Sequence, residues 1–323
     1  MNVLITGIDG FVGSHLADAL AGRPELRLFG TTRHSGSPKA SHPPAIPLHQ
    51  IEITDKEQVK KVIFDLAPQK LFHIAGQAFV PAALSDPYGT FRTNIDGLIN
   101  ILEAVRLLRL EKQVSCSVLV VSSSEIYAPV PLDKLPIDEN TPLIPSNPYA
   151  ASKACADLIA QQYRAAFGVD VVIARPFNHL GPRQSELFVG SALARQIAEI
   201  ILKKREPKLL VGNTETVRDF TDVRDVVQAY IRLLERPQSK PVFNVCSGRG
   251  IAVREILETL CSLSGIAIDV VQDPARMRHN EISTVIGDAG RLRASTGWSP
   301  QIPLRQTLQD LLHYWEGRIR NSE

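Results

Sequence analysis

The sequence has few cysteines, no excess of charge of one sign and no long hydrophobic run. Only 4 of its 323 residues are cysteine, and these are far apart, with no CxxC pair and no Cys/His cluster. This argues against a zinc site or a disulfide framework, so we expect no bound metal and a reducing compartment. Lysine and arginine number 36 against 34 acidic residues, which is too balanced to indicate a nucleic-acid or membrane-surface binder. No apolar run approaches the roughly 18 residues of a transmembrane helix, and we expect a cytoplasmic protein.

What the chain does have is an ordinary globular composition and a length that suits about two folding units. Short β-rich runs alternate with longer segments of helical period, which indicates parallel βαβ units. Continuous apolar runs at 117–121 and 169–174 suit strands that are buried on both faces of a parallel sheet. The predicted strands of this region lie at 2–6, 26–31, 46–53, 70–74, 117–122 and 169–175, and the predicted helices at 11–21, 56–66, 91–108 and 148–167.

This regular alternation breaks after residue 175, where prolines and glycines indicate a loop. Further helices and short strands follow, and a helix and a strand within 224–246 look like a return to the main sheet. We therefore expect an α/β fold with a Rossmann-type doubly wound parallel sheet and a smaller mixed α/β C-terminal substrate lobe. The domain with the main sheet would comprise residues 1–175 plus about 213–250, and the smaller lobe about 176–212 plus 251–323.

Three glycines follow the first predicted strand directly, in the segment Gly7-Ile-Asp-Gly10-Phe-Val-Gly13. Glycines at this place allow a tight turn and a close approach of backbone N–H groups to a pyrophosphate, and the next helix N-terminus adds partial positive charge. A glycine trio alone also fits an ordinary loop, but its position after the first strand of a βαβ unit favours dinucleotide binding. The GxxGxxG spacing is typical of extended short-chain dehydrogenase/reductases, a family that the chain resembles.

The second predicted strand lacks the terminal acid that usually holds the 2′-hydroxyl of NAD, and it carries Arg33 instead. A guanidinium can bind a 2′-phosphate through two parallel hydrogen bonds, so we expect NADP(H) as the preferred cofactor. NAD(H) is the alternative if Arg33 is only a solvated loop charge. The resemblance implies that Glu52 faces the adenine and that the segment from Ile74 to Gln77 lines the cofactor. The expected cofactor contacts are Gly7, Gly10, Phe11, Val12, Gly13, Arg33, Glu52, Ile53, Ile74, Ala75, Gln77, Asn94, Ser122, Tyr149, Lys153 and His179.

The strongest single motif is Tyr149-Ala-Ala-Ser-Lys153. The i, i+4 spacing places the phenol and the ammonium on one helix face, and Asn147 and Pro148 suit the N-cap and the first position of that helix. A free phenol has a pKa of about 10, and a neighbouring ammonium and an oxidised nicotinamide would each lower it toward the working pH. The pattern YxxxK occurs by chance in many helices, but here it accompanies the glycine turn.

The resemblance assigns roles to the residues around this motif. Ser123 would orient the substrate oxygen that Tyr149 protonates, and Lys153 would also hold the nicotinamide ribose. Ser124 is a second candidate hydroxyl. Glu125 has two interpretations: in related sugar dehydratases a glutamate here removes the C5 proton, whereas in a reductase it is a hydrogen-bonding partner in the site, and we favour the second.

The second half of the chain is similar to one branch of this family, the GDP-4-keto-6-deoxy-mannose reductases, which are related to GDP-mannose 4,6-dehydratases. The similarity is carried by residues 174–185, 211–225, 243–248, 272–281 and 296–300. It implies that arginines neutralise the diphosphate and that Glu281 accepts hydrogen bonds from the ribose, although any one arginine alone would be interpreted as a surface charge. The expected substrate contacts are Ser124, Asn178, Val189, Arg218, Arg278 and Glu281.

Departures from the dehydratase pattern favour a reductase. The segment from Phe188 to Ala192 lacks two basic residues of the dehydratase loop, and Arg183-Gln184 stands where a dehydratase usually has two arginines. We therefore predict an NAD(P)H-dependent reduction of the C4 ketone of GDP-4-keto-6-deoxy-D-mannose to GDP-D-rhamnose. The alternatives are a GDP-mannose 4,6-dehydratase, another NDP-sugar epimerase or reductase such as one that forms GDP-6-deoxy-D-talose, and a catalytically silent dinucleotide-binding protein. The resemblance also implies a homodimer through the helices near 91–108 and 148–167.

Overall fold

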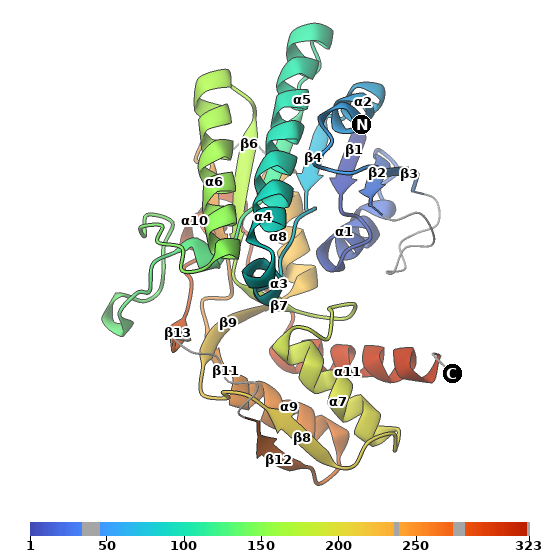
Figure 1. Cartoon of the computed structure of the whole chain (residues 1–323), viewed down its shortest axis with the longest axis vertical. Helices are drawn as coiled ribbons and strands as arrows, with labels where there is room; N and C mark the ends of the chain where they lie inside the picture. Colours follow the sequence, from blue (N-terminus) through green and yellow to red (C-terminus); the bar gives the residue numbers. More distant parts are fainter. Residues whose placement is uncertain (34–45, 236–238, 274–281, 322–323) are drawn as a thin grey trace.

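The computed structural model describes residues 1–33, 46–235, 239–273 and 282–321. Seven strands form one sheet in the order β10-β6-β5-β4-β1-β2-β3, and every neighbouring pair is parallel (Figure 1). The strand order reverses between β1 and β4, which is the switch point of a doubly wound sheet. The predicted Rossmann-type fold is confirmed. Its strands are β1 (Asn2–Thr6), β2 (Arg27–Thr32), β3 (Leu48–Gln50), β4 (Lys70–His73), β5 (Ser117–Val121), β6 (Val171–Pro176) and β10 (Val242–Val245).

Successive residues of a strand point to opposite faces of the sheet, so the apolar strands present buried side chains on both faces, and helices cover both. Val3 and Ile5 of β1 belong to one buried cluster and Leu4 to another. The first cluster is closed by α1 (Phe11–Ala21), α8 (Val223–Glu235) and α10 (Gly290–Thr296), and the second by α2 (Lys56–Leu66), α5 (Gly97–Lys112) and α6 (Pro148–Phe167). Between β4 and α5 lie α3 (Val80–Ser85), α4 (Pro87–Phe91) and a π-helical turn, η1 (Arg92–Asp96); two 3-10 turns follow β5, η2 (Ser124–Ile126) and η3 (Leu132–Lys134).

The remaining elements form a smaller lobe at one end of the main sheet (Figure 1). Strand β9 (Val217–Asp222) pairs with β7 (Asn178–Leu180), β11 (Gly250–Ala252) and β13 (Thr284–Val285), while β8 (Lys208–Val211) pairs with β12 (Asp269–Gln272). Helices α7 (Val189–Ile201), α9 (Val253–Ser264) and α11 (Leu304–Arg320) close a third buried cluster. Among the described residues, no helix has the length and apolar character needed to cross a bilayer.

Two predicted elements differ from the observed ones. The strand expected over 46–53 contains only three paired residues, because β3 meets β2 only from Leu48 to Gln50. The single helix expected over 91–108 is interrupted by η1 before α5 begins at Gly97.

Candidate active site

The glycine turn between β1 and α1 is shaped so that only glycine fits at two of its positions. Gly7 has φ +67°, and a Cβ on Gly13 would lie 2.1 Å from the Gly7 carbonyl oxygen. Gly10 is the N-cap of α1, and no side chain of the described residues caps this helix end. Phe11 and Val12 form the first turn of α1. Uncapped backbone N–H groups beside a close-packed glycine turn fit a pyrophosphate.

A cavity of about 270 Å³ opens at the carboxyl end of β2. Two residues predicted to bind the adenosine half of the cofactor, Arg33 and Glu52, both line it. A third, Ile53, has a buried side chain that faces Gly97 at the start of α5. The cavity combines a guanidinium, a carboxylate and amides, which suits an adenine and its phosphorylated ribose. Its lining residues are Arg33, Gln50, Ile51, Glu52 and Gln58.

The turn after β4, which was predicted to line the cofactor, is held by Thr6, the last residue of β1. Its Oγ1 accepts hydrogen bonds from the N–H groups of Ile74 (3.1 Å) and Ala75 (3.2 Å) and lies 3.0 Å from Nδ1 of His73. Burial lowers the pKa of His73 to about 3, so the imidazole is neutral at physiological pH. Neither Thr6 nor His73 was predicted from the sequence as a site residue. No short spacing marks them, because the contact joins residues 67 positions apart.

Asn94 connects the same turn to helix α6. Its Oδ1 accepts the Gln77 N–H at 2.8 Å, and its Nδ2 donates to the Gln77 carbonyl at 3.0 Å and to Oγ of Ser152 at 2.8 Å. Asn94 lies in the π-helical turn η1 and is buried. π-Helical turns commonly occur at functional sites, and this one directs Asn94 toward α6, the helix that carries Tyr149.

Tyr149, Lys153 and Ser123 come together where β5 ends and α6 begins. Asn147 caps α6 by accepting the Ala150 N–H at 2.9 Å, which fixes the start of the helix. The Lys153 Nζ donates to the Val121 carbonyl at 2.9 Å, and the Tyr149 phenol forms a hydrogen bond with Ser123. Tyr149 is 8% and Lys153 9% exposed, so both polar groups are shielded from solvent within reach of one reacting centre.

Burial shifts both groups away from their ordinary pKa values. It raises the pKa of Tyr149 to about 12; the hydrogen bond from Ser123 partly offsets this, and the negative charge of Glu125 adds to it. Burial also lowers the pKa of Lys153 to about 8. The expected lowering of the phenol pKa is therefore not seen in the protein alone, because the desolvation of the phenolate outweighs the effect of the Ser123 hydrogen bond.

The other candidates after β5 lie beside this group. Ser122 is buried, and its Oγ donates to the Lys153 carbonyl at 3.5 Å. Ser124 and Glu125 form the 3-10 turn η2, which Ser123 caps by accepting the Glu125 N–H at 3.2 Å. Glu125 is exposed while Ser123 is buried, so the carboxylate lies at the open side of the site.

The predicted substrate residues come from the smaller lobe and the strand that leads to it. His179 of β7 stacks on Phe11 of α1, with ring centroids 5.8 Å apart, and its neighbour Asn178 is exposed. Val189 begins α7 and is also exposed. Arg218 of β9 donates to the Val217 carbonyl at 2.9 Å and to the Ser283 carbonyl at 3.3 Å. Arg278 and Glu281 lie outside the described residues.

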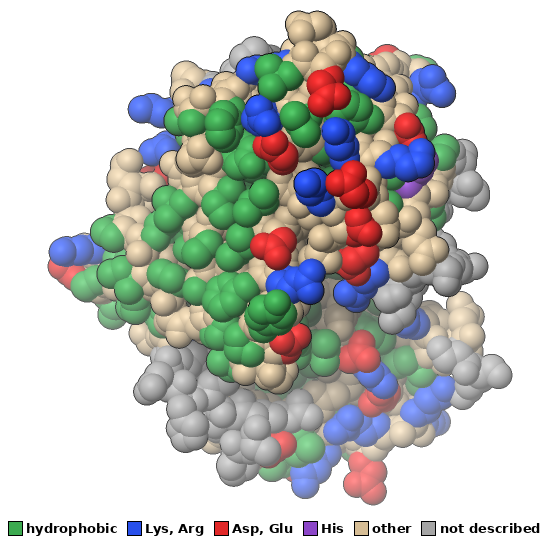
Figure 2. Space-filling model, turned by 45° about the horizontal axis from the view of Figure 1, so that its top comes forward, with side chains coloured by type: hydrophobic (Ala, Val, Ile, Leu, Met, Phe, Trp, Pro, Cys, Tyr) green, Lys and Arg blue, Asp and Glu red, His purple; other side chains and the backbone are tan. Residues whose placement is uncertain are grey.

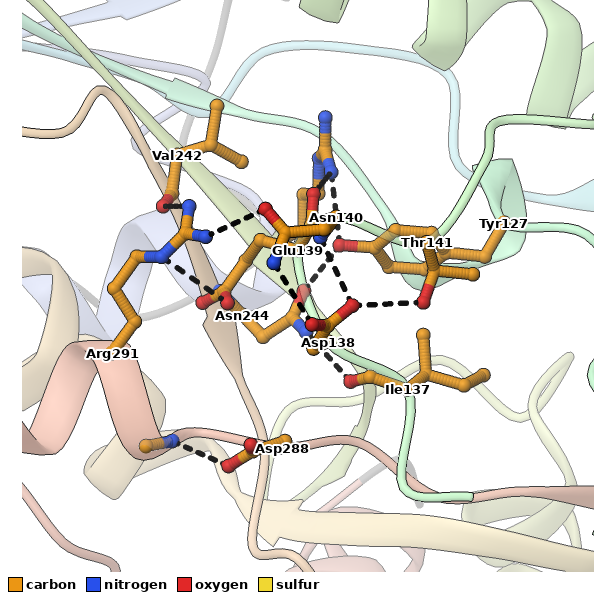
Figure 3. A network of polar contacts seen from close by, with 12 residues as sticks. Tyr127, Ile137, Asp138, Glu139, Asn140, Thr141, Val242, Asn244, Asp288 and Arg291 are labelled. Carbon is orange, nitrogen blue, oxygen red and sulfur yellow. Dashed lines mark hydrogen bonds and ion pairs between the residues drawn. The ribbon is translucent and has the colours of Figure 1, made fainter. Parts of the chain in front are cut away.

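A buried polar network links α6 to β6 and β10, and Figure 3 shows the part of it around Tyr127 and Asn244. Arg175 of β6 donates to both carboxylate oxygens of Asp157 at 2.8 and 2.9 Å and to the Tyr127 hydroxyl at 2.9 Å. Tyr127 in turn donates to Oδ1 of Asn244 at 2.6 Å. This network was not predicted from the sequence, although Asp157 follows Lys153 at the i+4 spacing of one helix face.

The chain matches one protein family and several known proteins. The sequence profile of the GDP-mannose 4,6 dehydratase family matches residues 4–311. The chain is 37% identical to the GDP-6-deoxy-D-mannose reductase of Pseudomonas aeruginosa, with 99% of both chains covered. It is 30% identical to the GDP-6-deoxy-D-talose 4-dehydrogenase of Aggregatibacter actinomycetemcomitans, with 90% of both chains covered. The solved structure of RMD from Pseudomonas aeruginosa complexed with NADPH superposes with a TM-score of 0.85 at 36% identity, covering 98% of this chain and 99% of that one. This chain therefore belongs to the GDP-mannose 4,6 dehydratase family, within the nucleotide-sugar branch of the short-chain dehydrogenase/reductases that its motifs predicted.

Proposed function

We propose that this chain is an NADPH-dependent reductase that converts the C4 ketone of GDP-4-keto-6-deoxy-D-mannose to the hydroxyl of GDP-D-rhamnose. The observation that carries the proposal is the buried Tyr149–Lys153 pair beside Ser123, in a chain that matches a GDP-6-deoxy-D-mannose reductase over its whole length. NADH is the second cofactor that we expect the chain to accept.

In this proposal the proton that completes the reduction comes from a residue of the chain. Bound NADPH supplies the hydride that adds to C4 of the sugar. Tyr149 donates its phenolic proton to O4, Ser123 orients that oxygen, and the Lys153 ammonium stabilises the phenolate that remains. A pKa of about 12 keeps Tyr149 protonated at neutral pH, which is the state that a proton donor needs.

The nucleotide half of the substrate is assigned to the smaller lobe. Arg218 contacts two backbone carbonyls, and its guanidinium brings a positive charge with five N–H donors that suits a diphosphate. Asn178 offers an exposed amide at the end of the strand that carries His179. Arg278 and Glu281 complete the proposed GDP site on the basis of the sequence motif alone.

The proposed assembly is a homodimer in the cytoplasm. Figure 2 shows hydrophobic side chains gathered over one broad area of the molecule. Exposed ones on α4, α5 and α6 include Tyr88 (74%), Leu110 (53%) and Leu158 (56%), and burying such a surface favours association. All four cysteines are free thiols, which suits a reducing compartment. Light scattering of the purified chain tests the dimer, and a monomer at micromolar concentration would contradict it.

The reductase is tested by mixing the purified protein with NADPH and enzymatically prepared GDP-4-keto-6-deoxy-D-mannose. We expect rapid loss of the reduced-nicotinamide absorbance and a product whose C4 configuration, measured by NMR, is that of rhamnose. The talose configuration at C4 would support the reduction, but the product would be GDP-6-deoxy-D-talose instead of GDP-D-rhamnose. No loss of absorbance with this sugar would contradict the proposal.

The second candidate, a GDP-mannose 4,6-dehydratase, is supported by the position of Glu125. Its charge is one of the causes that raise the pKa of Tyr149, so the carboxylate lies near the reacting centre and could remove a C5 proton. Incubation with GDP-mannose and NADP⁺ separates the two functions. Formation of the 4-keto-6-deoxy sugar, abolished in Glu125→Gln, would establish the dehydratase.

A further inference from the structure

The glycine turn carries an acidic side chain, Asp9, that has no role in the proposed reduction. Asp9 lies between Gly7 and Gly10, and its Oδ2 accepts a hydrogen bond of 2.7 Å from Oγ1 of Thr32, the last residue of β2. Thr32 is buried and Asp9 is half-buried. The carboxylate is therefore held against the end of the second strand.

The backbone fixes the turn in this place. The N–H groups of Gly7 and Ile8 donate to the Thr31 carbonyl at 3.1 and 3.3 Å, directly beyond the point where Thr6 of β1 pairs with Thr31 of β2. In a Rossmann domain the adenosine ribose binds in the crevice between this turn and the end of the second strand. Asp9 thus lies beside the strand end that leads into Arg33, on the side of the glycine turn where such a ribose would bind.

An aspartate and an arginine in this crevice favour different cofactors. A carboxylate accepts hydrogen bonds from the ribose hydroxyls of NAD(H), which is the role of the acid that usually ends the second strand. The same carboxylate repels a 2′-phosphate, since a phosphate monoester carries a charge of roughly −1.5 to −2 at pH 7. Arg33, which lines the neighbouring cavity, attracts that phosphate through charge-assisted hydrogen bonds.

We propose that Asp9 is a cofactor-selectivity residue. Its carboxylate, held by Thr32, accepts a hydrogen bond from a ribose hydroxyl of the adenosine half and opposes the 2′-phosphate preference that Arg33 confers. The acid that second strands of NAD-binding domains usually carry is here supplied by the glycine turn. The inference rests on the proposed use of a nicotinamide cofactor, and it predicts that the chain binds both dinucleotides, with a ratio of affinities set by Asp9 and Arg33.

The test measures binding rather than turnover. Calorimetric titration of NADP⁺ and NAD⁺, without sugar substrate, gives both dissociation constants for the unmodified chain and for Asp9→Asn, which keeps the side-chain shape and an acceptor oxygen for Thr32. We expect NADP⁺ to bind about tenfold more tightly to Asp9→Asn and NAD⁺ to bind more weakly, since loss of one nearby unit charge changes phosphate binding by about this factor. Arg33→Gln is expected to shift the ratio in the opposite direction.

Glu25→Gln is the matched control, because it removes an equal charge from an exposed position before β2, at the end of the strand far from Thr32. It should leave the ratio of the two affinities unchanged. Asp9→Ser provides a second neutral variant with a different side chain, and it should shift the ratio in the same direction as Asp9→Asn. If both variants change the two affinities by the same factor, or not at all, the role of Asp9 is overturned while the reductase proposal stands. If the unmodified chain binds neither dinucleotide, the cofactor proposal and this inference both fail.

Discussion

Arg175 and Asp157 form a bidentate ion pair in the interior: Nε and Nη2 of the arginine donate to the two carboxylate oxygens at 2.8 and 2.9 Å, and the two side chains are 4% and 0% exposed. Asp157 lies one helical turn after Lys153 on α6, and Arg175 lies on β6 three residues before Asn178. The pair therefore ties the helix of the proposed proton donor to the strand that leads into the proposed substrate site.

Removal of one partner should destabilise the whole fold. Asp157→Asn leaves the Arg175 charge buried with its strongest acceptor lost, and we expect a loss of about 3–5 kcal/mol in the free energy of unfolding. Urea denaturation followed by circular dichroism measures this loss. Asp65→Asn, which breaks an exposed Lys61–Asp65 contact on α2, is the control and should not move the midpoint. Equal midpoints for the two variants would contradict the inferred importance of the buried pair.

The close packing of the glycine turn gives a second prediction. A Cβ at position 13 would lie 2.1 Å from the Gly7 carbonyl oxygen, so Gly13→Ala must displace the turn. A Cβ at Gly22 would meet none of the described residues within 4 Å. We expect Gly13→Ala to weaken NADPH binding by more than about tenfold, because the backbone N–H groups no longer face the pyrophosphate together. Quenching of protein fluorescence by NADPH measures the affinity, and Gly22→Ala at the other end of α1 should bind like the unmodified chain. Normal binding by Gly13→Ala would show that the pyrophosphate does not lie at this turn.

Local patterns in the sequence sufficed for the parts of the fold that depend on neighbouring residues. The strand 2–6 followed by Gly7, and the capped helix that begins at Pro148, are both specified by adjacent residues and appear where they were predicted. The residues at the end of the second strand suggested that Arg33 binds a 2′-phosphate, and the family resemblance implied that Glu52 faces the adenine; the structure shows that both line one cavity.

The features that were not predicted depend on contacts between residues far apart in the chain. The turn η1 interrupts a periodic helix because Asn94 bonds to Gln77 and to Ser152, 17 and 58 positions away. The contact between Asp9 and Thr32 needs the register of β1 against β2, which the alternation of apolar residues does not give. The rise in the pKa of Tyr149 follows from burial by the assembled core, whereas the sequence showed only the neighbouring ammonium.

The lowered pKa of Lys153 predicts a pH dependence of the reaction. Its ammonium has a pKa of about 8, so the charge is lost as the pH rises through that value, while Tyr149, with a pKa of about 12, stays protonated. We expect kcat/KM for the ketosugar to fall above about pH 8, because the neutral amine no longer stabilises the phenolate. Lys153→Arg keeps a positive charge at this position throughout this pH range, so the fall in kcat/KM above about pH 8 should disappear, even if turnover is lower. If the fall persists in this variant, another group is the one that titrates.

The buried His73 predicts that acid destabilises the fold. Its pKa is about 3 in the folded protein against 6.5 when exposed, so between these values the unfolded chain takes up a proton that the folded one does not. The free energy of unfolding is therefore largest above pH 6.5 and falls as the pH falls, by up to about 1.4 kcal/mol per pH unit for this one group. Urea denaturation between pH 4 and pH 7 should show a steeper decline for the unmodified chain than for His73→Asn, which has no titrating group. His15 and His179, whose pKa values burial also lowers, are present in both proteins and cancel in the comparison. If the free energy of unfolding falls equally with pH in both proteins, His73 takes up its proton in the folded state as well. The ring that contacts Thr6 would then not be the neutral imidazole inferred here.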